Sequence, residues 1–162
     1  MAEEKAGKPS FGKLQHIGVV VKDINKAMEY LETLGIGPFG MPGAPEGSPK
    51  TFTVPFKGEL HGKPAEWKTT ITFAKIGDVE LEMLEPTEGA QALKESLDET
   101  GEGLHHLGYM TDDLDDTIAY FKDKGVGTWT IARQDNGGGF LYTDPSPVGG
   151  IALEFRKMGK PS

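Results

Sequence analysis

The chain has 162 residues, 36% of them hydrophobic and 26% charged, which suits a single domain with one shared core. Its formal net charge of −8 is spread along the sequence without a basic cluster, which argues against a nucleic-acid partner. The sequence contains no cysteine, so a disulfide, a catalytic thiol and a thiolate metal ligand are excluded. A few local cations are still sufficient to bind one anionic small molecule.

The ends of the chain are expected to lie outside the folded part. Residues 1–10 contain no apolar signal core, and no apolar run is long enough to span a membrane. We therefore expect a cytoplasmic protein with a flexible tail at residues 1–10 and no membrane partner. A single domain is expected over residues 11–157, followed by a C-terminal tail at 158–162.

Local patterns in the first half predict one helix and several strands. The apolar run 14–21 predicts a strand, and Asp23 or Asn25 can cap a helix that follows it. Residues 37–68 are rich in proline and glycine, which predicts a long loop interrupted by a short strand at 51–56. The remaining predicted elements are a strand at 69–74, a turn at Gly77-Asp78 and a strand at 79–84.

A linker helix is expected within residues 87–103, after which the second half repeats the order of the first. Its predicted elements are a strand at 104–110, an Asp-capped helix around Ile118 and Phe121, and strands at 128–132, 140–143 and 151–156. Both halves are thus approximately βαβββ, with module one at 11–86 and module two at 104–157. Because strands outnumber helices in each half, we predict an α+β fold with helices on one face of the sheet.

The two halves share a sequence repeat at an offset of 90 residues. HIGVVVKDINKAMEYLETLGIG begins at His16, and HLGYMTDDLDDTIAYFKDKGVG begins at His106. The copies also end alike, in GDVELEM with Glu82 and in GGIALEF with Glu154. The histidine and glutamate are 66 positions apart in the first copy and 48 in the second, so the first copy is 18 residues longer. A repeat that preserves a histidine indicates a preserved site as well as a preserved fold.

These four repeated residues are candidate metal ligands. Alternate side chains of a strand share a face, so Glu82 lies opposite the apolar residues that flank it. A glutamate in a central strand costs free energy unless it is paired, protonated or bound to a cation. A lone strand histidine is more often a hydrogen-bonded core residue, but its occurrence in both halves favours a site. We predict that His16, Glu82, His106 and Glu154 bind a divalent metal ion and leave open positions for water or substrate.

Other polar and aromatic residues are weaker candidates. His105 is expected on the face opposite His106 as a packing residue that donates one hydrogen bond, and His61 is expected in solvent. Glu80 is either an acid next to the site or, as we expect, an exposed strand residue. The run 137–139 favours a hairpin turn over an anion cradle, since no helix follows it. Four aromatic residues either form an apolar lid or pack the long loop against the core: Phe39, Phe52, Phe56 and Trp67.

Paired βαβββ modules that carry HIGVVVKD, LHHLGYMTDDLDD, VELEMLEP and IALEF resemble the vicinal oxygen chelate superfamily of glyoxalases, bleomycin-resistance proteins and dioxygenases. Within it, GEGLHHLGY, EMLEP and GGGFLYTDP are most similar to methylmalonyl-CoA epimerases. The sequence departs from those epimerases at Asp144-Pro145, where a histidine usually precedes the proline, and at 69–72, where some carry an acid. The resemblance covers residues 11–157.

The resemblance implies two modules that form a curled mixed sheet around a metal-binding cleft. It implies ligation by His16, Glu82, His106 and Glu154, with Co, Ni, Zn, Mn or Mg as the candidate ion. It also implies a homodimer, because two-module members of the superfamily often pair.

The leading functional hypothesis is a metal-dependent epimerase or isomerase. Glu82 is present where extradiol dioxygenases lack a carboxylate, which favours redox-neutral chemistry. The expected reaction is proton transfer next to a carbonyl of an acyl-CoA or 2-oxo compound, with Glu154 or Glu82 as the base. Glu80 and Glu66 are less favoured bases. The alternatives are a glyoxalase I-like lyase and a non-catalytic protein that binds a small molecule.

Overall fold

The computed structural model describes residues 8–161, so most of the expected N-terminal tail and Ser162 lie outside the described residues. The first half contains β1 (His16–Val20), α1 (Ile24–Thr33), β2 (Phe52–Leu60), β3 (Lys63–Ile76) and β4 (Val79–Glu88). Helix α2 (Ala92–Glu99) links it to the second half. That half contains β5 (Gly103–Met110), α3 (Leu114–Asp123), β6 (Thr128–Arg133), β7 (Gly139–Thr143) and β8 (Ala152–Lys157).

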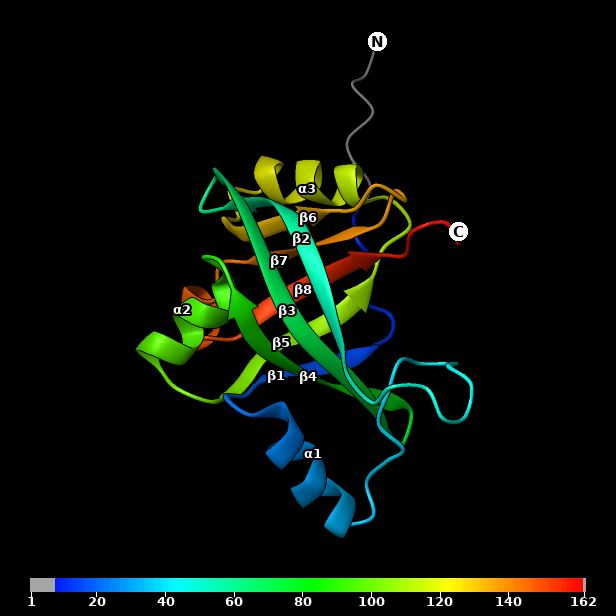
Figure 1. Ribbon diagram of the computed structural model, residues 1–162. Helices are drawn as coiled ribbons and strands as arrows, with labels where there is room; N and C mark the ends of the chain where they lie inside the picture. Colours follow the sequence, from blue (N-terminus) through cyan, green and yellow to red (C-terminus); the bar gives the residue numbers. More distant parts are fainter. Residues whose placement is uncertain (1–7, 162) are drawn as a thin grey trace.

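The predicted α+β fold with two βαβββ modules and a curled mixed sheet is confirmed (Figure 1). The strands follow the order β1-β4-β3-β2-β6-β7-β8-β5 and close into a barrel. Within each half the first and last strands are parallel neighbours, β1 with β4 and β5 with β8. The two modules join through the antiparallel pair β1–β5, which places the two strands with the repeated histidines side by side.

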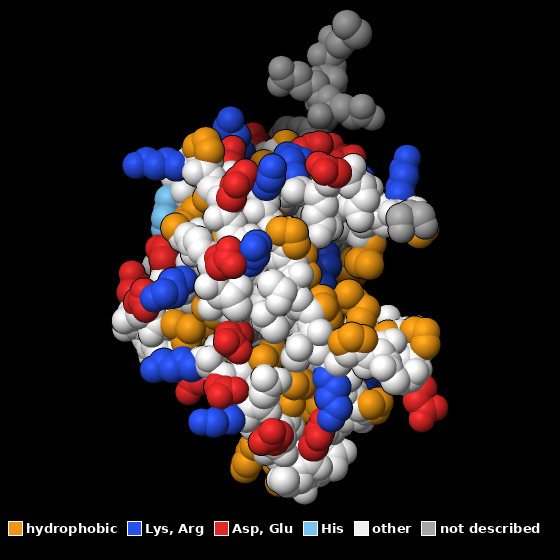
Figure 2. All heavy atoms as spheres, in the orientation of Figure 1, with side chains coloured by type: hydrophobic (Ala, Val, Ile, Leu, Met, Phe, Trp, Pro, Cys, Tyr) orange, Lys and Arg blue, Asp and Glu red, His pale blue; other side chains and the backbone are white. Residues whose placement is uncertain are grey.

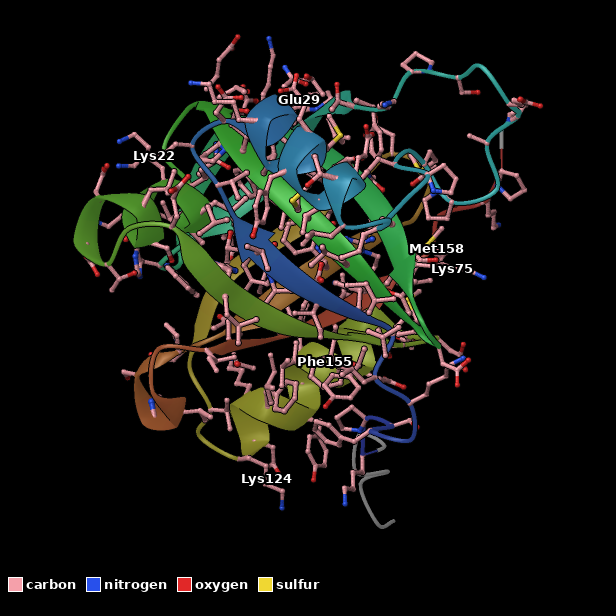
Figure 3. The ribbon with its side chains drawn as sticks, turned by 90° about the horizontal axis from the view of Figure 1, so that it is seen from below. Lys22, Glu29, Lys75, Lys124, Phe155 and Met158 are labelled. Carbon is pink, nitrogen blue, oxygen red and sulfur yellow. The ribbon has the colours of Figure 1, made fainter. Side chains whose placement is uncertain are left out.

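Helices α1 and α3 cover opposite outer sides of the barrel (Figure 1). Each begins at the repeated aspartate: Asp23 accepts a hydrogen bond from the Lys26 amide, and Asp113 accepts one from the Asp116 amide. Strand alternation supplies the packing surface, since Phe155 follows Glu154 in sequence but lies on the outer side against α3 (Figure 3). No helix in residues 8–161 is long and apolar enough to cross a membrane.

The strand predicted at 51–56 is confirmed as the start of β2, but the predicted loop is wrong for residues 57–68, which belong to a long hairpin of β2 and β3. Proline within this segment suggested a loop, but β2 tolerates Pro55 because it is an edge strand at that point. Its pairing with β6 begins only at Lys57. Of the four aromatic residues, Phe39, Phe56 and Trp67 are buried in the core and Phe52 is partly buried.

The barrel closes through a short contact between the two halves. Strand β2 pairs with β6 only from Lys57 opposite Arg133 to Leu60 opposite Thr130. Gly58 permits this approach, because a Cβ atom there would lie 1.9 Å from the carbonyl oxygen of Ile131. On the N-terminal side of Lys57, β2 no longer pairs with β6. The barrel is therefore closed at one end and opens into a cleft at the other, where Phe52, Val54 and Phe56 line the wall.

Candidate metal centre

The register of the central pair β1–β5 explains the repeated His-x-Gly motif. His16 is opposite Gly108, and Gly18 is opposite His106. A Cβ atom at Gly108 would lie 1.9 Å from Cε1 of His16, and one at Gly18 would lie 2.1 Å from Cε1 of His106. Each module's glycine therefore provides the space that the other module's imidazole occupies.

The strands that flank the β1–β5 pair, β4 and β8, each place one glutamate beside a repeated glycine. Glu82 on β4 is the register partner of Gly18, and Glu154 on β8 is the register partner of Gly108. Each carboxylate can therefore extend across a glycine toward the imidazoles. The side chains of His16, Glu82, His106 and Glu154 are fully buried and meet inside the barrel.

One atom from each of these four residues points to a common region. The Nε2 atoms of His16 and His106 are 3.2 Å apart, and Glu82 Oε2 lies 3.2 Å from His16 Nε2 and 3.1 Å from His106 Nε2. Glu154 Oε2 is 3.1 Å from His106 Nε2 and also contacts His16 Nε2. Ligand atoms at bond lengths near 2.1 Å from a common ion are about 3.0–3.4 Å apart, a range that includes the four separations of 3.1–3.2 Å.

Neighbouring side chains orient both imidazoles. Gln15 Oε1 contacts Nδ1 of His16. If the proton of the neutral imidazole lies on Nδ1, the lone pair of Nε2 is available to a metal ion. His105 Nδ1 lies 2.8 Å from His106 Nδ1, and the His105 ring stacks on Trp129. His105 is therefore a buried packing residue with one hydrogen-bond partner, in line with the prediction, and that partner is His106 of the site. Its own Nε2 has no hydrogen-bond partner among the described residues.

Arg156 holds the outer oxygens of the two carboxylates. Its Nη2 lies 2.9 Å from Glu82 Oε1 and 3.3 Å from Glu154 Oε1, whereas the Oε2 atoms face the histidines. In each carboxylate, the guanidinium thus contacts Oε1 and the imidazoles contact Oε2. This geometry suits one ligating oxygen per carboxylate.

Without an ion, opposite charges stabilise the cluster. Burial alone would lower the pKa of His16, but the charges of Glu154 and Glu82 outweigh it and raise the pKa to about 9. The same balance raises the pKa of His106. Burial alone would raise the pKa of both glutamates, but the charges of Arg156 and the histidines lower it. A metal ion would therefore displace protons from the histidines as it binds.

The donor set fits a divalent ion. Two imidazole nitrogens and two carboxylate oxygens are the nitrogen and oxygen ligands that first-row divalent ions accept, and the two carboxylates balance a charge of +2. The structure therefore brings together all four residues that the sequence indicated. Their role as metal ligands stays a prediction.

The other sequence candidates lie elsewhere. Glu66 is exposed and pairs with Lys57, so it is not a nearby base. Glu80 lines a hollow beneath the 37–50 loop, and one of its oxygens is buried without a partner among the described residues. His61 is largely exposed, as expected, but it also contacts Glu95. Residues 137–139 lie at the hairpin between β6 and β7, as predicted.

A cleft of about 1010 Å³ leads from the molecular surface to Glu82 and Arg156. Its walls are largely apolar and include Phe52, Phe73 and Phe140. Figure 2 shows hydrophobic side chains beside a hollow on the right of the molecule, between the C-terminal segment and the 37–50 loop. The expected C-terminal tail forms part of this rim, where the Lys160 amide donates a hydrogen bond to the Asn136 carbonyl.

Three further residues contact the site although no role was predicted for them: Gln15, Tyr142 and Arg156. The Tyr142 ring stacks on His106 at 4.9 Å between ring centroids. For Arg156 a signal was present, because strand alternation places it on the same face as Glu154. No sequence signal identified Gln15 or Tyr142, since their contacts depend on side-chain direction and on long-range strand order.

Comparisons with known proteins agree with this architecture. The sequence profile described as Glyoxalase/Bleomycin resistance protein/Dioxygenase superfamily matches residues 15–142. An uncharacterised protein of Bacillus subtilis, YqjC, is 26% identical over 147 residues, which cover 88% of this chain and 90% of that protein.

Solved structures of methylmalonyl-CoA epimerases share the fold. A variant of the Streptomyces coelicolor epimerase, in complex with 2-nitronate-propionyl-CoA, is 24% identical, with a TM-score of 0.61 over 93% of this chain and 100% of that chain. The Mycobacterium tuberculosis epimerase is 18% identical, with a TM-score of 0.57 over 99% and 94%. The profile match covers most of the sequence, and the chain belongs to the glyoxalase/bleomycin resistance/dioxygenase superfamily.

Proposed function

We propose that the protein is a metal-dependent epimerase or isomerase that transfers a proton at a carbon next to a carbonyl group. The observation that carries this proposal is the buried convergence of His16, Glu82, His106 and Glu154, since Glu82 of this cluster also lines a large, mainly apolar cleft. These four residues would hold Co, Ni, Zn, Mn or Mg. When bound, such an ion supplies Lewis-acid polarisation of a carbonyl oxygen, which makes the neighbouring C–H more acidic.

Glu154 is the proposed base, and Glu82 is the second candidate. Both are ionised at neutral pH because Arg156 and the histidines lower their pKa, so either can accept a proton once it is released from its partners. The apolar cleft would limit access of bulk water to the deprotonated carbon. Glu80 and Glu66 are not proposed as bases, because neither belongs to the cluster.

The proposed substrates are small acyl thioesters and 2-oxo compounds. One structural relative is described as methylmalonyl-CoA epimerase in complex with methylmalonyl-CoA and NH4+, and it is 24% identical with a TM-score of 0.61. At that identity the similarity supports a shared fold, so the substrate class depends on the cluster and the cleft. We also propose that the protein forms a homodimer, which light scattering at micromolar concentrations would test.

The decisive experiment measures solvent deuterium incorporation. Metal-loaded protein is incubated in D₂O with methylmalonyl-CoA, other 2-methylacyl-CoAs and 2-oxo acids, and the mass of each compound is followed. We expect deuterium at the carbon beside the carbonyl, with incorporation lost after metal chelation and in Glu154→Gln. Glu66→Gln, an exposed carboxylate, is the matched control that should retain exchange.

The size and apolar lining of the cleft also favour a second function, sequestration of a small apolar molecule. The same compound panel separates the two. Absence of exchange in every compound, together with tight binding of one apolar ligand, would support sequestration. Conversion of a hemithioacetal without exchange of any acyl-CoA would instead support the glyoxalase I-like lyase.

A further inference from the structure

Arg156 is the charged group that faces the cleft from the candidate metal centre. Its side chain is 22% exposed, whereas the side chains of Glu82 and Glu154 are 0% exposed. Arg156 lines both the large cleft and the small cavity beside Tyr142. A ligand that enters from the surface therefore meets this guanidinium before it reaches the buried carboxylates.

Part of the guanidinium remains available to a ligand. Within residues 8–161, the hydrogen bonds of Arg156 to Glu82 and Glu154 all use Nη2. Nη1 and Nε make no such bond in the described part of the chain and are not among its enclosed, unpartnered atoms. Nη1 carries two N–H groups and can donate charge-assisted hydrogen bonds to a carboxylate oxygen.

The surroundings favour a negatively charged partner for these free nitrogens. The Arg156 guanidinium lies 5.7 Å from the centre of the Phe73 ring, and the nearby cleft wall is apolar. Two carboxylates balance a divalent ion, so Arg156 adds one positive charge that the cluster does not neutralise. The other acidic residue of the cleft, Asp135, belongs to the segment after β6 rather than to the cluster.

Arg156 also breaks the symmetry of the repeat. In the aligned copies Glu154 corresponds to Glu82, so Arg156 corresponds to Leu84. Leu84 is 3% exposed and belongs to the hydrophobic core. The repeat therefore accounts for the four candidate ligands but not for the arginine, which points to a role specific to one side of the site.

We propose that Arg156 is a specificity-determining residue that binds a carboxylate group of the ligand through Nη1. The site then selects small carbonyl compounds that carry a carboxylate over neutral compounds of the same shape. This inference rests on the proposed function for its reaction but not for its binding step.

Binding of malonate and of its neutral analogue malonamide tests the proposal. Titration calorimetry on protein saturated with a divalent ion gives the ratio of the two affinities, which cancels effects that both ligands share. We expect wild-type protein to prefer malonate, Arg156→Gln to reduce that preference at least about tenfold, and Arg156→Lys to have an intermediate preference. Lys124→Gln removes an equal charge at the C-terminal cap of helix α3, away from the cleft, and should leave the preference unchanged (Figure 3).

A purely structural role for Arg156 gives a different result. If the arginine only orients Glu82 and Glu154, then Arg156→Gln weakens metal binding but leaves the preference of the metal-saturated protein unchanged. That result in both Arg156 variants would overturn the proposal. Since the readout is binding, absence of deuterium exchange in the wild type would contradict the proposed function without affecting this inference.

Discussion

The inner end of the cleft and its mouth differ in their relation to the sequence repeat. At the inner end Glu82 and Arg156 line the cleft, and behind them lies the candidate centre, in which each of the four residues has a counterpart in the other half. The mouth is formed by the start of β2, the turn after β6 and the C-terminal segment, which lie outside the repeated sequence segments. Coordination of a metal ion would restrict which residues the repeated segments can carry at the centre. The residues of the mouth have no such restriction and can be adapted to a particular ligand. The following predictions test that division.

The largest effect is expected from removal of one repeated histidine. His16→Ala or His106→Ala should reduce metal content from about one ion per chain to near zero, because each loses a nitrogen donor. Loss of a residue that merely supports a ligand costs 10–100-fold in affinity, so loss of the ligand should exceed about 100-fold. Elemental analysis measures the content. His61→Ala is the matched control, since His61 is outside the cluster, and unchanged metal in both site variants would refute the four-residue centre.

The next effect concerns the repeated glycines. Gly108→Ala places a methyl group against the His16 ring and should displace the imidazole, with a loss of metal affinity of about 10–100-fold. Overpacking should also lower the free energy of unfolding by about 1–3 kcal/mol.

Gly127→Ala is the matched control for this prediction. Gly127 is also part of the repeat, but its Cβ would lie 3.5 Å from the nearest heavy atom, an ordinary contact. Metal titration and denaturant unfolding compare the two variants. Equal behaviour would mean that the glycine opposite His16 does not maintain the imidazole position.

The third prediction is a pH dependence of the metal-free protein. Folding raises the pKa of His16 from 6.5 to about 9, so its contribution to stability is complete below about pH 6.5 and is lost as the pH rises through 9. This loss should reach about 3 kcal/mol for His16 alone. Denaturant unfolding between pH 6 and 9.5 in the presence of a chelator measures it.

A saturating divalent ion provides the comparison for this pH series. The ion keeps both imidazoles neutral, so the loss of stability should shrink and the metal affinity should increase with pH. An unfolding free energy of the metal-free protein that stays constant or increases from pH 6.5 to 9 would contradict the charged histidine–glutamate cluster.

The smallest expected effect belongs to the mouth. Phe52 lines the cleft and stacks on Phe73, with ring centroids 6.2 Å apart. Phe52→Ala should raise KM about tenfold through lost apolar contact and leave metal content unchanged. Phe11→Ala, which removes an exposed aromatic contact with Tyr109, is the control. A large loss of metal in Phe52→Ala would show that the two regions are not independent.

The sequence by itself determined the modular architecture and the four candidate ligands. Repetition was the reason: a histidine and a glutamate kept at matching places in both halves indicate a shared position even when the distance between them along the chain differs. Strand alternation also predicted that Met83 and Phe155 lie away from the site, and both pack against the outer helices. An aspartate cap was predicted for the second helix, and Asp23 was one of two caps offered for the first; Asp113 and Asp23 take these roles because the capping interaction is local.

Only the tertiary structure decided how the site is completed. The register of β1 against β5 gives Gly18 and Gly108 their role, and register depends on the whole sheet rather than on neighbouring residues. Closure of β2 against β6 turned a segment rich in proline and glycine into long strands, since pairing across the barrel outweighs local propensity. Arg156 was visible only as a residue on the same face as Glu154. Its contact with both carboxylates depends on β4 and β8 facing each other across the barrel, which sequence spacing does not specify.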